Sequence, residues 1–435
     1  MWRIKEAFDP RLLCNPGKVL PDRDEIADPE PLALPDGSFY RAAPEVAARN
    51  DRGCFEPIDP EAVQKLLAVA HRERQRVVLR GAGTKLGPVA EEVAVIDTQR
   101  LNRIIAYDHE NLTITVQCGV TLPQIDEAVA SHGQMLALRP RFAQCATLGG
   151  ILAANESAPH SLLYGGPREL VTGIEAALPN GEVVNFGSSC VKNVAGYAVE
   201  KLFVGSEGSL GAILKTTLRT LPRPNALRTV ALPLSDPLLA ASLLVELLAS
   251  PLRPAAVELL NPTAGQILAE ADNSWWLLIG LEGFTADVDE MSQHLTAMGA
   301  DHGLGHWQEL DADYLALWSE VTDLGPQAPN APILKTSCPL SATTALAGEL
   351  DALDSQVALR AAPGLGLVHC AVTSKLGLQD YYSEAQGLAT KYGGTTLWLA
   401  PTPAGLSTSA QASAPEICRR LKAAFDPRGI LPEVQ

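Results

Sequence analysis

The sequence predicts an α+β protein in two parts, an α/β domain with glycine-rich turns followed by a ferredoxin-like α+β domain. Three observations predict this class. Helix and strand patterns alternate from Pro60 onward, a proline cluster interrupts them at 222–224, and a second alternating series runs from there to Leu399. With 435 residues, the chain is long enough for two or three domains that each bury a core.

The first part begins with a helix over 60–72, because Val63, Leu66, Leu67 and Ala70 recur at helical spacing. Short apolar or alternating runs with turn residues between them predict the strands that follow. These strands are expected at 77–79, 93–96, 112–116, 171–178, 183–186 and 212–221, with a further helix at 122–130.

The second part repeats strand and helix in a way that is typical of a ferredoxin-like sheet covered on one face. The expected strands are 229–232, 255–260, 275–281, 333–338, 365–372 and 395–399. The expected helices are 237–249, 286–298, 340–353 and 379–392. The first 50 residues contain prolines within an acidic stretch and predict a linker or a surface tail.

The overall charge excludes some partners. The formal net charge is -16, which repels phosphate backbones, so no nucleic-acid partner is expected. No run approaches the ~18–20 apolar residues of a membrane helix, and the first residues lack a signal core. We therefore expect a cytoplasmic protein that reaches a membrane only through a partner.

The eight cysteines are scattered and form no CxxC pair, so they are expected to be reduced packing residues. His302 and His306 are separated by glycines and do not form a helical metal pair. The sequence therefore predicts no metal or iron–sulfur site held by this chain.

A first glycine motif, Arg80-Gly81-Ala82-Gly83-Thr84-Lys85, directly follows the expected strand 77–79. Glycines let a backbone approach a diphosphate closely, and Thr84 adds a hydroxyl donor. Taken alone, such a motif more often marks an ordinary turn.

Two further glycine motifs follow in order. Ala146-Thr147-Leu148-Gly149-Gly150 precedes an expected helix start, where free N–H groups can meet a phosphate. Gly205-Ser206-Glu207-Gly208 leads into the strand at 212, and Lys192 lies upstream, where it could neutralise a phosphate or a flavin.

These three motifs resemble, in sequence and in order, the FAD-binding domain of PCMH-type (vanillyl-alcohol-oxidase-like) oxidoreductases. The resemblance covers about residues 55–224 and implies a two-lobed FAD-binding domain followed by a ferredoxin-like cap. It implies that FAD is bound by residues of all three motifs and their surroundings. These residues are Arg80, Gly81, Ala82, Gly83, Thr84, Lys85, Ala146, Thr147, Gly149, Gly150, Asn155, Tyr164, Gly165, Lys192, Asn193, Gly205, Ser206, Glu207, Gly208 and Ile213.

Within this family, residues 192–197 and 221–224 are similar to the E-type subunit of glycolate oxidase. Residues 3–11 echo residues 420–428, and with their continuation to Pro21 they resemble the tail of a D-type subunit. The expected domains are thus a D-type-like extension (1–54), an FAD-binding domain (55–224), a cap (225–400) and a C-terminal return helix (401–435). The extension fits either a reduced D–E fusion or a translation start upstream of the usual one.

Two departures from the family pattern bear on the cofactor. The second motif continues as Asn155-Glu156-Ser157-Ala158-Pro159, where relatives often carry glycines, so the backbone beside the flavin is altered. Thr84 stands where relatives with covalent flavin often carry histidine, which favours non-covalent FAD.

Oxidation of a hydroxy acid needs a base for the hydroxyl proton and a cation for the carboxylate. The His-rich cap motif of D-type relatives is absent, so the candidates for the base are His369, in an expected cap strand, and His160. Lys335 and Arg139 are possible carboxylate anchors. For the two histidines a structural role is the more common alternative, and for Lys335 and Arg139 the alternative is an ordinary surface charge.

The sequence therefore predicts an FAD-carrying subunit of a glycolate or related 2-hydroxy-acid dehydrogenase. The resemblance implies a small 2-hydroxy acid as substrate, a D-type flavoprotein and an iron–sulfur F-type subunit as partners, and electron transfer toward quinone or another acceptor. Two alternatives stay open. One is a self-sufficient dehydrogenase of another hydroxy acid such as D-lactate, and the other is a non-catalytic assembly subunit.

Overall fold

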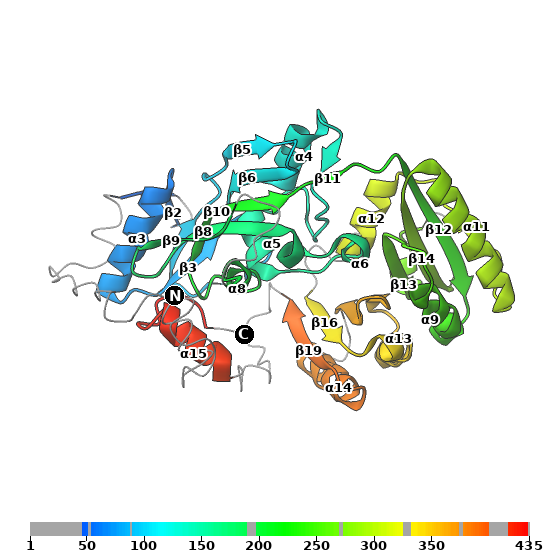
Figure 1. Ribbon diagram of the computed structural model, residues 1–435. Coiled ribbons are helices and arrows are strands. Elements are labelled where there is room, and N and C mark those ends of the chain that lie inside the picture. The colour runs from blue at the N-terminus through cyan, green and yellow to red at the C-terminus, as the bar shows by residue number, and fades with distance from the viewer. Residues whose placement is uncertain are drawn as a thin grey trace, which may run out of the picture.

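The computed structural model describes residues 46–50, 54–87, 89–188, 197–268, 273–324, 332–373, 377–399 and 416–433. These residues form two parts (Figure 1). The first domain, at one end, has two α/β lobes, and the cap, at the other end, is a large sheet with helices. The predicted α+β class, with two lobes followed by a ferredoxin-like cap, is confirmed.

The first lobe holds a four-stranded sheet in the order β1-β2-β4-β3. Its strands are β1 (Ala48–Arg49), β2 (Phe55–Glu56), β3 (Val77–Arg80) and β4 (Ala94–Asp97), with the helix α3 (Pro60–Glu73) between β2 and β3. The side chain of Asp59 accepts a hydrogen bond from the N–H of Ala62 and starts α3. The buried face of α3 contains the four apolar residues that predicted it.

The second lobe holds a five-stranded antiparallel sheet in the order β5-β6-β10-β8-β9. Its strands are β5 (Ile104–Asp108), β6 (Thr113–Gln117), β8 (Val171–Ala177), β9 (Val183–Gly187) and β10 (Ala212–Arg219), and β7 (Gln134–Met135) pairs with β11 (Leu221–Pro222) beside them. Its helices are α4 (Leu122–Ala130), α5 (Leu148–Ala154), α6 (Ser161–Tyr164), α7 (Pro167–Leu170) and α8 (Glu200–Phe203).

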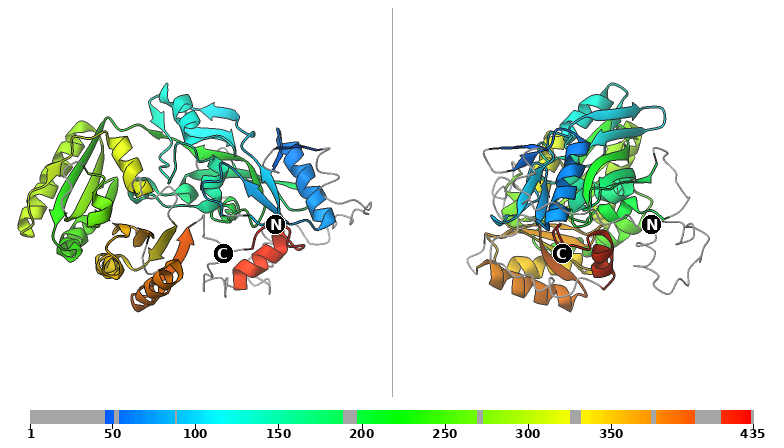
Figure 2. Two further views of the ribbon diagram at one scale, coloured as in Figure 1. Left: turned by 180° about the vertical axis from the view of Figure 1, so that it is seen from behind. Right: turned by 90° about the vertical axis from the view of Figure 1, so that its left-hand side faces the viewer.

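The last described helix, α15 (Glu416–Phe425), returns to the first domain, as Figures 1 and 2 show. Leu421, Phe425, Ile430 and Leu431 join the hydrophobic core that both lobes share. Lys422 is buried, and its ammonium donates to the carbonyls of Ser209 and Leu431 and to the carboxylate of Asp426. The C-terminal segment therefore completes the first domain rather than the cap.

The cap contains one eight-stranded antiparallel sheet in the order β15-β12-β14-β13-β17-β18-β16-β19. The strands are β12 (Ala226–Leu234), β13 (Ala256–Leu260), β14 (Trp275–Gly283), β15 (Gln308–Glu309), β16 (Ile333–Ser337), β17 (Ala358–Ala362), β18 (Leu367–Ala371) and β19 (Thr395–Leu399). Within each run of four strands the spatial order is 4-1-3-2, the ferredoxin-like arrangement. The cap is therefore two ferredoxin-like units joined through β13 and β17.

Helices cover both faces of this sheet, whereas the sequence predicted a cover on one face only. The outer face packs on η3 (Pro237–Ala240), α9 (Ala241–Ala249), α11 (Thr285–Asp301), η4 (Leu340–Ala342), α13 (Thr343–Leu353) and α14 (Leu378–Lys391). The inner face packs in part on α10 (Pro262–Gly265) and α12 (Tyr314–Asp323), and α12 lies between the sheet and the first domain. The prediction failed because it did not include α12, although Tyr314, Leu317, Trp318 and Val321 recur at helical spacing and form its buried face.

Among the described residues, no helix combines the length and the apolar character needed to cross a membrane.

Candidate functional site

A cavity of about 480 Å³ lies in the first domain and reaches the cap. Its walls come from all three glycine motifs, from Cys118 and Thr98 behind them, and from Trp398 and Leu399 of β19. The volume is in the range of cofactor and ligand pockets. Three segments that lie far apart in the sequence therefore meet around one cavity, as the order of the motifs predicted.

The first two motifs approach each other too closely for side chains. A Cβ atom added at Gly81 would lie 1.9 Å from the hydroxyl oxygen of Thr147. Gly83 has a φ of 76°, a left-handed conformation that glycine adopts without strain. Both positions therefore need glycine for the backbone to form this wall.

The wall offers backbone donors to a ligand. Within the part of the chain that the structure describes, the N–H groups of Gly81, Ala82 and Gly150 have no protein acceptor. Gly150 lies in the first turn of α5, where such N–H groups are free, and Thr147 precedes that helix. Unpaired donors on a close backbone suit the diphosphate of a dinucleotide, so the residues present fit FAD.

Most of the predicted cofactor residues line this cavity. They are Arg80, Gly81, Ala82, Gly83, Thr84, Lys85, Thr147, Gly149, Gly150, Ser206, Glu207, Gly208 and Ile213.

The remaining predicted cofactor residues lie elsewhere. Ala146 is buried behind the wall, and Asn155 packs against Gly205. The hydroxyl of Tyr164, next to Gly165, donates to Glu282 of the cap at 2.5 Å. Lys192 and Asn193 lie outside the described residues.

The inner face of the cap sheet contains a row of charged residues. Lys335 is paired in register with His369, and His369 with Arg360 on the other side. The guanidinium of Arg360 contacts Glu258 of β13 at 3.3 Å. On each strand the neighbours of these residues belong to the core under the outer helices, so the row itself points inward, toward the first domain.

The loop after α5 and the segment before it face this row. Lys85 pairs with Glu156, and its ammonium also donates to the carbonyl of Arg141 at 3.1 Å. Burial lowers the pKa of Lys335, and Glu156 and Glu207 partly oppose that shift. Since Glu156 and Glu207 both line the large cavity, the charged row lies beside it.

His369 lies in this row with an exposed fraction of 1%. Burial lowers its pKa well below the ordinary value, and the charges of Arg360, Lys335 and Arg141 lower it further. Neither ring nitrogen has a hydrogen-bond partner among the described residues. The lowered pKa keeps the imidazole of His369 neutral, and His369 itself does not line the large cavity.

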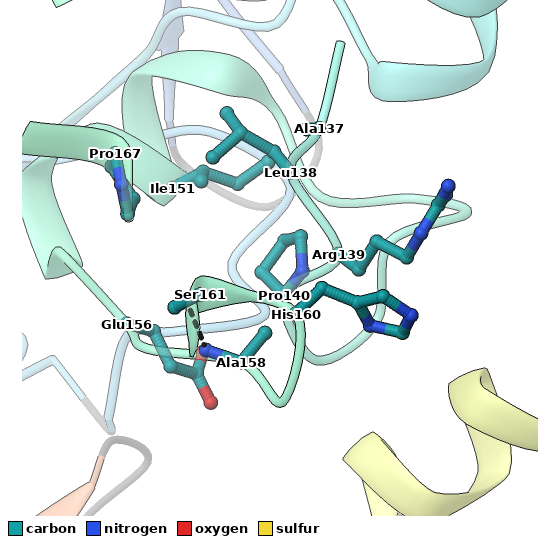
Figure 3. A pocket seen from close by; sticks show the side chains of 10 residues that line it. All are labelled: Ala137, Leu138, Arg139, Pro140, Ile151, Glu156, Ala158, His160, Ser161 and Pro167. Carbon is teal, nitrogen blue, oxygen red and sulfur yellow. Dashed lines mark hydrogen bonds between the residues drawn. The ribbon is translucent and has the colours of Figure 1, made fainter. Parts of the chain in front are cut away.

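His160 lies at a different place, between α6 and the cap. It borders a small cavity of about 10 Å³, room for about one water molecule, and its ring points toward α12 (Figure 3). Its Nε2 is 3.0 Å from the hydroxyl of Tyr314 and 3.2 Å from the carboxylate of Glu282. Burial lowers its pKa, against the effect of Glu282. His160 does not line the large cavity. Arg139 lies beside His160 and borders the same small cavity.

The described residues contain no group of three or more histidine, cysteine, aspartate or glutamate side chains arranged to hold a metal.

Some residues of the site were missed by sequence reasoning, namely Arg141, Glu156, Glu258, Arg360 and Trp398. A signal was present for two of them. Glu258 and Arg360 are single charged residues within otherwise apolar strands, Ala-Val-Glu-Leu-Leu and Ala-Leu-Arg-Ala-Ala. A charge in a fully buried strand needs a partner or a function.

Comparison with known proteins supports the interpretation of this cavity as an FAD site. The profile of the family described as "FAD binding domain" matches residues 52–187, and that of "FAD linked oxidases, C-terminal domain" matches residues 1–19. The glycolate oxidase subunit GlcE of Escherichia coli is 31% identical over 264 residues, which cover 60% of this chain and 70% of that protein. The subunit GlcD of Bacillus subtilis is 32% identical over 225 residues, 51% of this chain but only 48% of that protein.

Among solved structures, p-cresol methylhydroxylase has the same fold, with a TM-score of 0.67 at 15% identity over 87% of both chains. Fold and cavity thus define a flavoprotein with a PCMH-type FAD-binding domain. The chain belongs to the FAD-linked oxidoreductase family that includes the glycolate oxidase subunits, and its cofactor is FAD.

Proposed function

We propose that this chain is the FAD-carrying subunit of a glycolate or related 2-hydroxy-acid dehydrogenase complex. The observation that supports it is the junction between the cofactor cavity and the charged inner face of the cap. Trp398 and Leu399 of β19 and Glu156 line the cavity, and the row from Lys335 to Arg360 lies beside them. A small acid bound at this junction would lie next to the cofactor.

FAD supplies the acceptor for two electrons from the carbon that bears the hydroxyl group. The protein has to hold FAD non-covalently through the three glycine motifs, exclude water and take the hydroxyl proton. In this proposal His369 takes that proton on a ring nitrogen that has no partner among the described residues, although burial and the cations around it lower its pKa and make it a weaker base. His160 is the second candidate, although its Nε2 already faces Tyr314 and Glu282.

The partners belong to the proposal as well. The similarity to proteins named GlcD and GlcE supports a complex with a D-type flavoprotein, and an iron–sulfur F-type subunit would take electrons onward to quinone or another acceptor. The complex would be cytoplasmic or peripheral to the inner membrane. A chain that oxidises a hydroxy acid by itself is the alternative, and His369 would have the same role in it.

The test is a visible spectrum of the purified chain, followed by anaerobic addition of glycolate and then D-lactate. We expect a flavin spectrum and release of FAD by acid precipitation. Bleaching by a hydroxy acid in the chain alone would favour the self-sufficient alternative, and bleaching only with a D-type partner present would support the subunit. A colourless protein that FAD cannot reconstitute would contradict the proposal.

The role of His369 is tested by His369→Gln, with His132→Gln as the control at an exposed site. We expect equal FAD content in both variants and a rate of flavin reduction at least about 100-fold lower in His369→Gln only. A wild-type rate in His369→Gln would show that another residue accepts the proton, and His160 would be tested next.

A further inference from the structure

A cluster on the inner face of the cap contains buried polar groups, and several of their atoms have no hydrogen-bond partner among the described residues. This cap cluster consists of Glu258, Arg360 and His369 on the sheet, and Arg141 from the first domain. Arg360 and His369 each have an exposed fraction of 1%, Glu258 of 0% and Arg141 of 3%. No side chain of the cluster is therefore satisfied by bulk water.

Arg360 is the least satisfied of these groups. Its Nη1 contacts Glu258 at 3.3 Å, which is long for a charge-assisted hydrogen bond. Its Nε and Nη2 have no hydrogen-bond partner within the described ranges, and the same holds for the second carboxylate oxygen of Glu258. A buried guanidinium with two unpaired nitrogens destabilises the fold unless another group pairs with it.

Arg141 and His369 contribute further polar atoms without hydrogen-bond partners to the same cluster. The Nε of Arg141 and both ring nitrogens of His369 lack partners in the described part of the chain. The register of β17 and β18 pairs His369 directly with Arg360. Arg141 belongs to a first-domain segment that contacts the cap, because the N–H of the adjacent Phe142 donates to Asp323 of α12 at 2.9 Å. Its charge also contributes to lowering the pKa of His369.

Idle N–H donors from two guanidinium groups match the two oxygens of a planar carboxylate. Lys335, next in the row, adds a third positive charge, but Glu156 and Glu207 face it from the first domain. Glu156, which faces the row from the first domain, would repel a second negative charge on the ligand. The cluster therefore suits a small acid with a single carboxylate.

We propose that the cap cluster is the binding site for the carboxylate of a short monocarboxylic acid, with Arg360 and Arg141 as its two donors. This inference rests on the proposed function, in which such an acid is the substrate, and it assigns recognition to residues of this chain. Lys335 and Arg139, the anchors that the sequence suggested, would have secondary roles: Lys335 faces carboxylates that balance its charge, and Arg139 borders the small cavity at His160.

The experiment is a titration of the FAD-loaded protein with acetate, with the neutral isostere acetamide, and with malonate. Binding is followed by calorimetry and by the change in flavin absorbance. We expect saturable binding of acetate, at least tenfold weaker binding of malonate and no binding of acetamide. Acetamide that binds as well as acetate would overturn the proposal.

Two variants on different domains locate the site. Arg360→Lys keeps the charge beside Glu258 but loses the guanidinium fork, and Arg141→Gln removes the second donor without touching the sheet. Each is expected to weaken acetate binding at least tenfold. The matched control is Arg228→Gln, an arginine of the same sheet that pairs with Asp289 and Glu309 at the surface. Equal acetate affinity in all three variants would overturn the proposal.

The same titration separates the two proposals. Flavin that a hydroxy acid reduces normally in both arginine variants would refute the cap cluster and leave the proposed function standing. Acetate binding that depends on Arg360 in a protein unable to retain FAD would support the cap cluster and refute the proposed function. Calorimetry on the FAD-free protein provides this second reading.

Discussion

Glu258 shows how a single buried carboxyl can couple stability to pH. Burial raises its pKa from 4.5 to about 7, and the nearby Arg360 reduces that shift without cancelling it. The folded protein therefore keeps a proton on Glu258 that the unfolded chain releases between pH 4.5 and 7. Stability from this group is present below pH 4.5 and is lost as the pH rises toward 7.

We predict that this loss amounts to about 3 kcal/mol and that Glu258→Gln removes it. The measurement is urea unfolding from pH 5 to 8 in both proteins. The comparison isolates Glu258 from His369, whose lowered pKa gives a contribution of opposite sign. Identical pH dependence in wild type and variant would show that Glu258 does not titrate in this range.

Gly81 makes a second prediction at the residue scale. Its alanine variant places a methyl group against the hydroxyl of Thr147, so the first two motifs have to move apart. We expect FAD affinity to fall at least tenfold, measured by fluorescence on reconstitution. The control is Gly387→Ala on α14, where an added Cβ meets no atom within 4 Å, and it should retain FAD fully.

At the scale of elements, the helix α15 links the chain end to the cofactor cavity. Lys422 donates to the carbonyl of Ser209, which directly follows the third glycine motif, and the aromatic rings of Phe425 and Phe203 pack with their centroids 5.8 Å apart. Asp426 also accepts from the N–H groups of Ile430 and Leu431. The short helix α15 therefore holds in place both the C-terminal segment that follows it and the turn that contains Glu207.

Lys422→Met is predicted to destabilise the protein by about 3 kcal/mol, because it leaves the carboxylate of Asp426 buried without its cation. Urea unfolding measures this change, and FAD retention should decrease with it. Arg419→Met on the exposed side of the same helix should change stability by less than about 0.5 kcal/mol. Equal effects of the two substitutions would contradict the role of Lys422.

At the scale of the whole molecule, polar contacts join the first domain to the cap around α12. His160 contacts Tyr314 and Glu282, Tyr164 donates to Glu282, and the N–H of Phe142 donates to Asp323 at 2.9 Å. These contacts hold the segment that contains Arg141 in front of the cap sheet. The relative position of the two domains therefore decides the geometry of the site.

Tyr314→Phe is predicted to loosen this junction without unfolding either domain, at a cost of about 1–2 kcal/mol for the buried partners left unpaired. Hydrogen exchange should become faster in α12 and in residues 139–142 and stay unchanged in α3. Tyr392→Phe, which removes a hydroxyl bonded to Glu349 on the outer side of the cap, is the control. Unchanged exchange in α12 would indicate that the contact between Phe142 and Asp323, and not Tyr314, holds the two domains together.

What the sequence determined by itself is local. The glycines at 81, 83, 149, 150 and 208 specify backbone that a ligand can approach, and their order along the chain indicated the fold and FAD. The apolar spacing of α3 and the proline after α15 determined those helices in the same way. Such features follow from the conformational limits of a few neighbouring residues.

Only the tertiary structure decided the rest. It doubled the ferredoxin-like unit, added β17, which the sequence analysis did not predict, and put α12 on the inner face of the sheet. It also brought Glu258, Arg360 and His369 into one row, although 102 residues separate the first two in the chain. Strand register and domain packing are set by long-range burial of apolar surface, which leaves no mark at the spacing of the charged residues themselves.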